Sequence, residues 1–269
     1  MRNEMQEFYQ NKYNENERMQ RQPLEFFRCK EIISRYIDSD NMEIADIGGA
    51  TGAFSFWLAQ MGHNVHLLDY TPLHIEQAKE KGKELNAALS SYTLGDARQI
   101  PYSNDTFDIV LEMGPLYHLQ NERDRIQCLS EARRTLKNGG TIICEAISRY
   151  ANLFEGFRHN LIEDDRFVDI LNENLESGNH SPGDTPYFTT AFFHTPEILV
   201  EELKQAGFCD ISIIAVEGFG FSLDVDSVFS DPHKKKLLLK YIKETESNPD
   251  LIGISGHFMA VGKKIGDNL

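Results

Sequence analysis

The sequence has few cysteines, a shortage of positive charge and no long apolar run. Its 269 residues include four cysteines, Cys29, Cys128, Cys144 and Cys209. None of them forms a C-x-x-C pair or has a histidine at zinc-ligand spacing, so we expect neither a metal site nor a disulfide framework. Thiols kept reduced fit a cytoplasmic protein. No apolar stretch could span a membrane, and the N-terminus lacks the apolar core of a secretion signal.

The charge balance is strongly negative. Lysine and arginine number 27 and aspartate and glutamate 42, which gives a formal net charge of −15. That excess disfavours a protein that binds duplex DNA or tRNA through bulk charge. The Lys-rich segment 233–245 is typical of a solvated helix face. Apolar residues make up 41% of the chain and charged residues 26%, which is ordinary for a globular protein with a substantial core.

Short apolar runs alternate with helical patterns along most of the chain. Strands are predicted at 44–47, 65–68, 92–94, 107–113, 141–146, 211–216 and 257–261. Helices are predicted at 23–37, 54–61, 72–89, 122–136, 195–207 and 233–245, and Asn138-Gly139-Gly140 is predicted to end the fourth of them. This order predicts a Rossmann-like α/β fold, a doubly wound, mostly parallel seven-stranded sheet with helices on both faces.

Two segments depart from this alternation. Residues 1–22 are polar but contain aromatic side chains that could share a helical face, which favours a docked lid segment over a frayed tail. Residues 150–193 are aromatic and acidic, and we interpret them as an inserted helical cap. The predicted organisation is therefore a lid at 1–22, a core at 23–149, a cap at 150–193 and the C-terminal part of the sheet at 194–269.

The strongest chemical signal is the segment from Ile44 to Gly52, an apolar strand that runs into a turn of small residues and then a helix. Small residues allow a backbone to approach a ligand closely. Asp69 ends the next strand, 17 residues beyond Gly52, near the spacing at which an acid contacts the ribose of a bound nucleotide. The pattern favours a nucleoside-binding half over a merely structural turn.

Two further segments extend the pattern, Gly95-Asp96-Ala97 after the third strand and the fourth strand from Phe107 to Gly114. With them the chain resembles the class I S-adenosylmethionine-dependent methyltransferases, from about residue 24 to 147 in its motifs and from 195 to 263 in its pattern. The resemblance implies the cofactor S-adenosyl-L-methionine, with S-adenosyl-L-homocysteine as product. It assigns cofactor binding to Asp46, Gly48, Gly49, Ala50, Gly52, Asp69, Tyr70, Asp96, Ala97, Glu112, Leu116, Tyr13 and Arg18.

The segment Gly114-Pro115-Leu116-Tyr117-His118-Leu119 resembles a group of bacterial small-molecule methyltransferases within that class. This implies a small-molecule acceptor, with no nucleic acid and no membrane as partner. The predicted acceptor-binding residues are Tyr117, His118, Tyr187 and His194. His118 is the predicted catalytic base, because it follows the fourth strand and titrates near neutral pH. The alternative for His118 is a structural hydrogen bond. Tyr117 could instead pack on the donor, and Glu112 could be a structural acid.

Three other functions remain open. A nicotinamide dehydrogenase would use Gly48-x-Ala50-x-x-Ala53 as a degenerate form of its dinucleotide-binding fingerprint. The short-chain type of these enzymes also needs the motif Tyr-x-x-x-Lys, and no tyrosine in this sequence has a lysine four residues later. A nucleic-acid methyltransferase conflicts with the net charge, and Gly114-Pro115-Leu116-Tyr117 replaces the Asn/Asp-Pro-Pro-Tyr/Phe segment of base-modifying enzymes. A sensor or scaffold that binds S-adenosylmethionine without turnover would have the same donor motifs.

Overall fold

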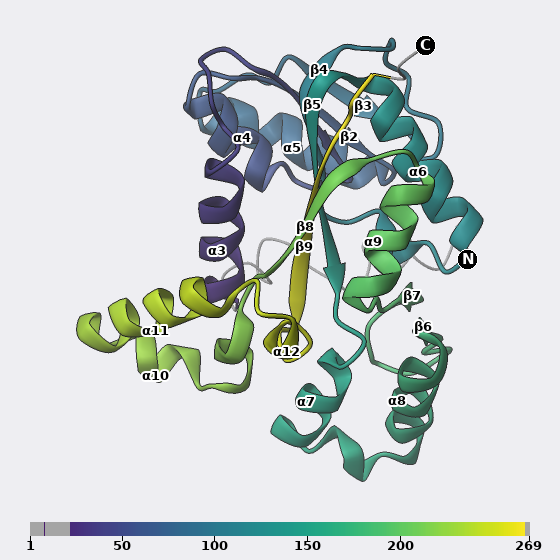
Figure 1. The fold of residues 1–269 in the computed structure, drawn as a ribbon, viewed down its shortest axis with the longest axis vertical. Helices are drawn as coiled ribbons and strands as arrows, with labels where there is room; N and C mark the ends of the chain where they lie inside the picture. Colours follow the sequence, from purple (N-terminus) through teal and green to yellow (C-terminus); the bar gives the residue numbers. More distant parts are fainter. Residues whose placement is uncertain (1–7, 9–21, 267–269) are drawn as a thin grey trace.

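The computed structural model describes residue 8 and residues 22–266, and they form one central sheet covered by helices (Figure 1). The strands of this sheet are β1 (Glu43–Ile47), β2 (Asn64–Asp69), β3 (Ser91–Leu94), β4 (Phe107–Glu112), β5 (Leu136–Ile147), β8 (Cys209–Ala215) and β9 (His257–Lys263). Their order is β3-β2-β1-β4-β5-β9-β8, and β9 runs antiparallel to both of its neighbours. The prediction of a mostly parallel, seven-stranded, Rossmann-like sheet is confirmed.

Helices cover both faces of the sheet. On one face lie α3 (Pro23–Ser34), α4 (Ala53–Gln60) and α5 (Pro72–Glu84), and on the other α6 (Glu122–Thr135) and α9 (Pro196–Gln205). Apart from the edge strand β3, the strands contribute to both cores, since in β4 Ile109 and Leu111 pack toward the first set of helices and Val110 toward the second. Such double burial explains why the strands are continuously apolar in the sequence.

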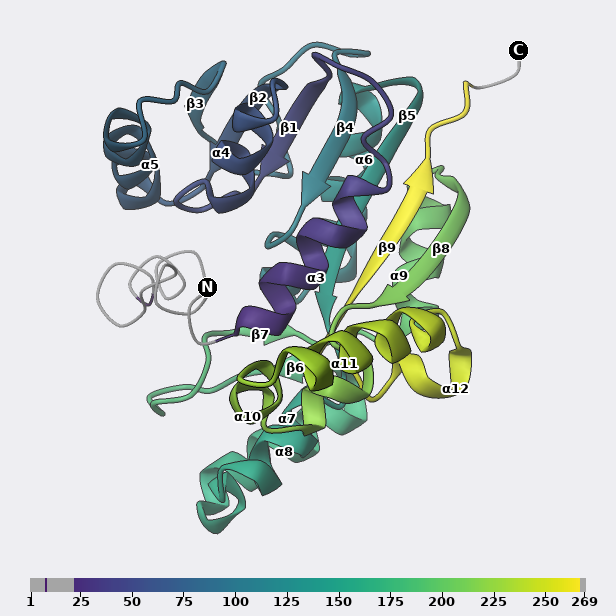
Figure 2. The same ribbon diagram turned by 90° about the vertical axis from the view of Figure 1, so that its left-hand side faces the viewer.

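The chain order places a ligand site beside β1. After β1 the chain proceeds to β2 and β3, and it then returns to the opposite side of β1 for β4 (Figure 2). Loops that follow β1 and β4 therefore diverge at this point of reversal. A crevice forms there at the carboxyl ends of the strands, where α/β proteins of this kind bind ligands.

Residues 148–194 leave the sheet after β5 and return to it before α9 (Figure 1). Their elements are α7 (Ala151–Arg158), the 3₁₀ helix η2 (Leu161–Glu163), α8 (Asp165–Ser177), and the short antiparallel pair β6 (Asn179–His180) and β7 (Ala191–Phe192). The two ends of the insertion pair with each other, because Ser148 and His194 form a β-bridge and Arg149 N donates to His194 O at 2.7 Å.

A second group of helices connects β8 to β9, and the sequence predicted only one of them. They are the 3₁₀ helix η3 (Gly218–Ser222), α10 (Val225–Phe229), α11 (Pro232–Thr245) and α12 (Pro249–Ile252). In Figure 2, α10 and α11 lie beside the start of α3. Leu24 of α3 packs against Leu238 and Ile242 of α11 in a small core of its own. No helix among the residues that the structure describes is long and apolar enough to cross a membrane.

Two predicted boundaries differ from the structure by five residues, more than the others. The third predicted helix ends at Glu84 rather than Leu89, because Asn86 adopts a left-handed φ of 48° and Ala87 N donates to Gly82 O. Asn138-Gly139-Gly140 does not follow the helix directly, since β5 already begins at Leu136. Leu136 pairs with Phe107 and Thr141 with Ile109, so the residues between them form a bulge.

Candidate active site

The turn after β1 has no room for a side chain at its first two residues. Gly48 has a φ of 73°, and a Cβ atom there would lie 2.7 Å from Pro115 Cδ. A Cβ atom on Gly49 would overlap Leu67 Cδ1 and lie 2.6 Å from Asp46 Cγ. The backbone is held in place from the next strand, because Gly48 N donates to Leu68 O at 2.7 Å. The turn therefore presents bare backbone to the cavity beside it.

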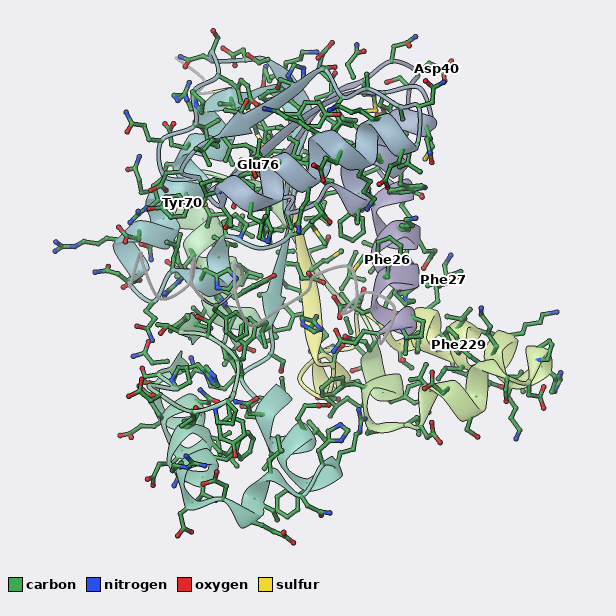
Figure 3. All side chains as sticks on the ribbon, turned by 180° about the vertical axis from the view of Figure 1, so that it is seen from behind. Phe26, Phe27, Asp40, Tyr70, Glu76 and Phe229 are labelled. Carbon is green, nitrogen blue, oxygen red and sulfur yellow. The ribbon has the colours of Figure 1, made fainter. Side chains whose placement is uncertain are left out.

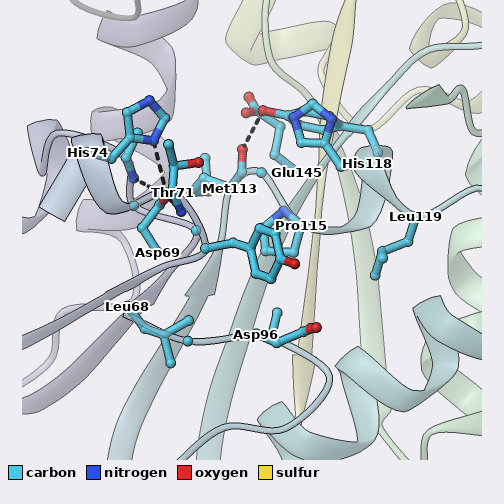
Figure 4. Close-up of a pocket in the computed structure, with 18 of the residues that line it drawn as sticks. Leu68, Asp69, Thr71, His74, Asp96, Met113, Pro115, His118, Leu119 and Glu145 are labelled. Carbon is cyan, nitrogen blue, oxygen red and sulfur yellow. Dashed lines mark hydrogen bonds and ion pairs between the residues drawn. The ribbon is translucent and has the colours of Figure 1, made fainter. Parts of the chain in front are cut away.

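Asp69 fixes this turn from the end of β2 (Figure 4). Its Oδ2 accepts from Ala50 N at 2.9 Å, and its Oδ1 accepts from Thr71 N at 2.7 Å. His74 Nδ1 lies 3.1 Å from the same Oδ1. With 6% of its surface exposed, Asp69 is held rigidly while it still lines the cavity. A carboxylate held in this way is ready to accept further hydrogen bonds from a ligand.

Asp96 lies at the third strand end and is part of an ion-pair network that the sequence did not reveal. Arg98 donates two hydrogen bonds to Asp96, from Nε to Oδ1 at 3.0 Å and from Nη2 to Oδ2 at 2.6 Å. The same guanidinium contacts Asp124 Oδ2 at 2.7 Å. The hydrogen bond to Asp96, followed by the charges of both acids, raises the pKa of Arg98 despite partial burial. All three residues line the cavity, so the network fixes the position of Asp96 beside Ala97.

Four predicted cofactor residues lie outside the cavity lining. Asp46 is fully buried beneath the turn, where Ser55 Oγ donates to its Oδ2 at 2.5 Å. Burial and the charge of Asp69 raise the pKa of Asp46 to about 6, against the opposing effect of Ser55. Glu112 is also fully buried and accepts from Cys128 Sγ at 3.2 Å, and Leu116 packs in the core beneath α6. Gly52 begins α4 and likewise lies outside the lining.

The other side of the cavity is formed by the loop after β4, by α3 and by the insertion. The 3₁₀ helix η1 (Leu116–His118) places Tyr117 and His118 on the lining, and Figure 4 shows His118 there. Tyr117 OH donates to Met113 O at 3.1 Å. The His118 ring lies 5.8 Å from the ring of Phe188 in the insertion. Gln120 Nε2 donates to Ala191 O at 3.3 Å, which joins this loop to β7.

The whole cavity has a volume of about 320 Å³. The predicted residues that the structure brings together around it are Gly48, Gly49, Ala50, Asp69, Tyr70, Asp96, Ala97, Tyr117 and His118. Figure 3 shows Phe26 on α3, and Tyr70 lies between the end of β2 and the start of α5. Two predicted acceptor residues lie elsewhere, since Tyr187 OH donates to Asp164 Oδ2 and the buried His194 pairs with Glu202. Tyr13 and Arg18 lie outside the described residues.

Reasoning from the sequence missed two buried carboxylates of the lining, Glu25 of α3 and Glu145 of β5. They are 6% and 2% exposed. A signal for Glu145 was present, because it is the charged residue within the otherwise apolar run Thr141-Ile142-Ile143-Cys144-Glu145-Ala146-Ile147. A charged residue in a strand that is buried on both faces carries a large desolvation cost, so its presence indicates a functional residue. Glu25 has no comparable signal, because Glu is ordinary near the start of a helix.

Comparison with known proteins agrees with this arrangement. Residues 45–144 match the family model described as "Methyltransferase domain". The matched segment contains the glycine turn, Asp69 and Asp96. Curated relatives include a 2-methyl-6-phytyl-1,4-hydroquinone methyltransferase of rice, 33% identical over 37% of this chain and 29% of its own length. A demethylmenaquinone methyltransferase of Lactococcus lactis is 30% identical over 51% of this chain and 56% of its own length.

The first curated relatives are matched over only 28% to 35% of their own length. Similarity of fold extends much further. A solved S-adenosylmethionine-dependent methyltransferase of Methanosarcina mazei superposes with a TM-score of 0.61 at 17% identity, over 88% of this chain and 98% of its own. A phosphoethanolamine N-methyltransferase of Haemonchus contortus, solved with S-adenosyl-L-methionine, has a TM-score of 0.56 at 16% identity, over 88% and 52% of the two chains. These likenesses establish the fold.

Proposed function

We propose that this chain is an S-adenosyl-L-methionine-dependent methyltransferase that acts on a small-molecule acceptor. The observation that carries the proposal is the cavity at the carboxyl ends of β1, β2 and β4, which combines a tight turn that begins with two glycines and acids at two successive strand ends. The match of residues 45–144 to a methyltransferase domain supports it. A dehydrogenase function has no comparable support.

The described residues fit the donor. Side chains at Gly48 and Gly49 would collide with Pro115 and with the buried Leu67 and Asp46, so glycine lets this part of the turn pack closely and leaves its backbone beside the cavity for a ligand. Asp69 and Tyr70 would hold the ribose end, while Asp96 and Ala97 would border the base. When bound, the donor supplies an electrophilic methyl group on a sulfonium, and the acceptor's lone pair forms the new bond as the C–S electron pair stays on sulfur. The protein's own contribution is then alignment and exclusion of water.

A small acceptor is supported by the size of the cavity and by the protein's charge. About 320 Å³ is at the lower end of small-molecule sites, and a net charge of −15 opposes a nucleic acid. The relatives named above are methyltransferases of quinone-type compounds. We also propose that residues 150–193 act as a cap over the acceptor, because Thr190 lines the cavity and Phe188 lies against His118.

Calorimetry with S-adenosyl-L-methionine and S-adenosyl-L-homocysteine tests the donor site. The Asp69→Ala variant removes a charged hydrogen-bond acceptor, which contributes about 1.5 to 3 kcal/mol, so its affinity should fall by about 10-fold to 150-fold. Asp40→Ala, a substitution at an exposed acid far from the cavity (Figure 3), is the control and should bind like the parent. Equal affinity in all three proteins contradicts the assigned pocket. Binding without any turnover to S-adenosyl-L-homocysteine in an acceptor screen identifies a sensor instead.

A further inference from the structure

Arg125 of α6 is a buried side chain that joins three parts of the chain beside the cavity. Only 3% of its surface is exposed. Its Nη1 donates to Leu119 O and to Gln120 O, both at 2.8 Å. Its Nε donates to Glu202 Oε1 at 2.8 Å, across the contact between α6 and α9 (Figure 1). The central guanidinium carbon Cζ lies 3.6 Å from the centre of the Phe192 ring in β7. Arg125 therefore links the loop before α6, α9 and the insertion.

The two carbonyls that Arg125 binds come directly after η1. This 3₁₀ helix ends at His118, and only Leu119, Gln120 and Asn121 separate it from the start of α6. His118 and Leu119 both lie on the cavity lining (Figure 4). Because hydrogen bonds from a charged donor are stronger than those between neutral groups, one guanidinium nitrogen fixes two consecutive peptide groups. The backbone that carries His118 is therefore held from inside the protein.

Glu202 fixes Arg125 from the opposite side. Glu202 is 1% exposed, its Oε1 lies 2.7 Å from Arg125 Nη2, and its Oε2 lies 3.2 Å from His194 Nε2. Burial raises the pKa of Glu202, but the hydrogen bonds of His194 and Arg125 outweigh it and lower that pKa overall. The carboxylate is therefore ionised at neutral pH and balances the guanidinium charge. A buried ion pair of this kind is favourable only while its geometry is kept, so it orients Arg125 toward Leu119.

A second arginine of α6 makes the same kinds of contact at the other end of the helix. Arg134 donates from Nη1 to Tyr102 O and from Nη2 to Ile100 O, both at 2.8 Å, and from Nε to Glu131 Oε1 at 2.8 Å. Tyr102 and Ile100 lie outside the cavity lining. The two arginines therefore share their chemistry and differ in which loop they hold.

We propose that Arg125 is a positioning residue for methyl transfer, which sets the place of Tyr117 and His118 by holding the loop that follows them. The inference rests on the proposed function and assigns a residue that acts through others. Arg125 lies outside the cavity lining, so it contacts neither donor nor acceptor. Transfer requires the acceptor to be aligned with the donor's methyl group, and a displacement of about 1 Å costs up to about 100-fold in rate. Loss of Arg125 should therefore lower kcat and leave donor affinity unchanged.

The variant Arg125→Lys, with Arg134→Lys as its matched control, tests the proposal. Lysine keeps the charge but has a single nitrogen, which cannot bind Glu202 and both carbonyls in the planar arrangement of a guanidinium. Turnover is measured with the best acceptor among catechol, tyramine, benzenethiol and hydroquinone. We expect Arg125→Lys to lower kcat by about 10-fold to 100-fold, with the affinity for S-adenosyl-L-homocysteine within a few-fold of the parent. Arg134→Lys should lower the melting temperature but keep the kcat of the parent.

Nuclear magnetic resonance of isotope-labelled histidine provides a second measurement that needs no acceptor. The His118 ring centre lies 4.7 Å from that of Tyr117 and 5.8 Å from that of Phe188, so the ring currents of both affect its resonance. The His118 signal is assigned by its absence in His118→Ala. It should move in Arg125→Lys and stay in place in Arg134→Lys, because only the first variant releases the loop after η1. A purely stabilising role would move it in neither.

The outcomes separate the inference from the proposed function. If Arg125→Lys does not fold, the double variant Arg125→Met with Glu202→Gln replaces it, because it removes both charges of the pair together. Equal kcat values in the two lysine variants, or an unmoved His118 resonance in a folded Arg125 variant, overturn the inference. The resonance decides alone if none of the four acceptors is methylated. Failure of the parent to bind S-adenosyl-L-homocysteine instead overturns the proposed function.

Discussion

Ala50 adopts a backbone conformation that favours glycine, and replacing it should stabilise the protein. Its φ is 49°, in the left-handed region, where an L-residue with a Cβ atom costs about 1 to 2 kcal/mol. Glycine removes that cost but loses about 0.4 to 1 kcal/mol through the greater freedom of the unfolded chain. Ala50→Gly should therefore raise the free energy of unfolding by about 0.5 to 1 kcal/mol and the melting temperature by about 1 to 3 °C.

Urea denaturation and calorimetry measure both quantities. The matched control is Ala59→Gly, which removes the same methyl group from the helical backbone of α4 and should destabilise the protein by about 1 kcal/mol. Opposite signs for the two variants are the expected result. If Ala50→Gly is neutral or destabilising while Ala59→Gly behaves as stated, the left-handed conformation assigned to the turn is wrong. The hydrogen bond from the amide of residue 50 to Asp69 is retained in the variant, so donor affinity should remain within a few-fold.

Three further predictions concern the site and its surroundings. Gly48→Ala should destabilise the protein by about 1 to 3 kcal/mol more than Gly139→Ala in urea denaturation, because both have a positive φ but only the former meets Pro115. Burial raises the pKa of Glu112 to about 7 despite a hydrogen bond from Cys128. The folded state thus holds the Glu112 proton more tightly than the unfolded state between about pH 4.5 and 7, and this group lowers stability by about 3 kcal/mol as pH rises through that window. Asp46 and His257, whose pKa values are also raised, add to the fall. In urea denaturation at pH 5 and 8, Glu112→Gln should therefore make the fall in stability smaller by about 3 kcal/mol than in the parent. His118→Ala should lower kcat by about 10²-fold to 10⁴-fold with donor affinity within a few-fold, whereas a destabilised but fully active variant removes His118 from the mechanism.

Most of the fold and the donor side could be predicted because their signals are local in the sequence. The run from Ile44 to Gly52 contains the strand, the turn and the start of the helix, and Asp69 follows at a fixed spacing. Thr195 before Pro196 predicted the start of α9, and its Oγ1 accepts from Ile198 N in the structure. Wherever one short segment contains both the element and its boundary signal, sequence reasoning succeeds.

The acceptor side could not be predicted in the same way because its contacts join distant segments. Glu25 and His257 are more than two hundred residues apart in the sequence, and only the packing of α3 against the sheet brings them within 3.8 Å. Likewise, His194 looked like a ligand residue from its position before α9, but the fold buries it against Glu202. Such contacts depend on the register of β5 with β9 and on the packing of α9, and no short sequence motif predicts either of these.

Because Ser148 pairs with His194, the segment between them begins and ends at one place in the fold and could be replaced as a unit. Both ends of that segment are fixed at one point, by the bond from Arg149 N to His194 O and by the 2.8 Å bond from His194 N to Ile147 O. A segment of different length would have to close the same short gap, and doubling a loop's length costs only about 0.6 kcal/mol. The matched methyltransferase domain ends at residue 144, just before this point. Evolution could therefore exchange this insertion while leaving the glycine turn and its acids unchanged, and a protein engineer could graft a different segment between the same two anchors.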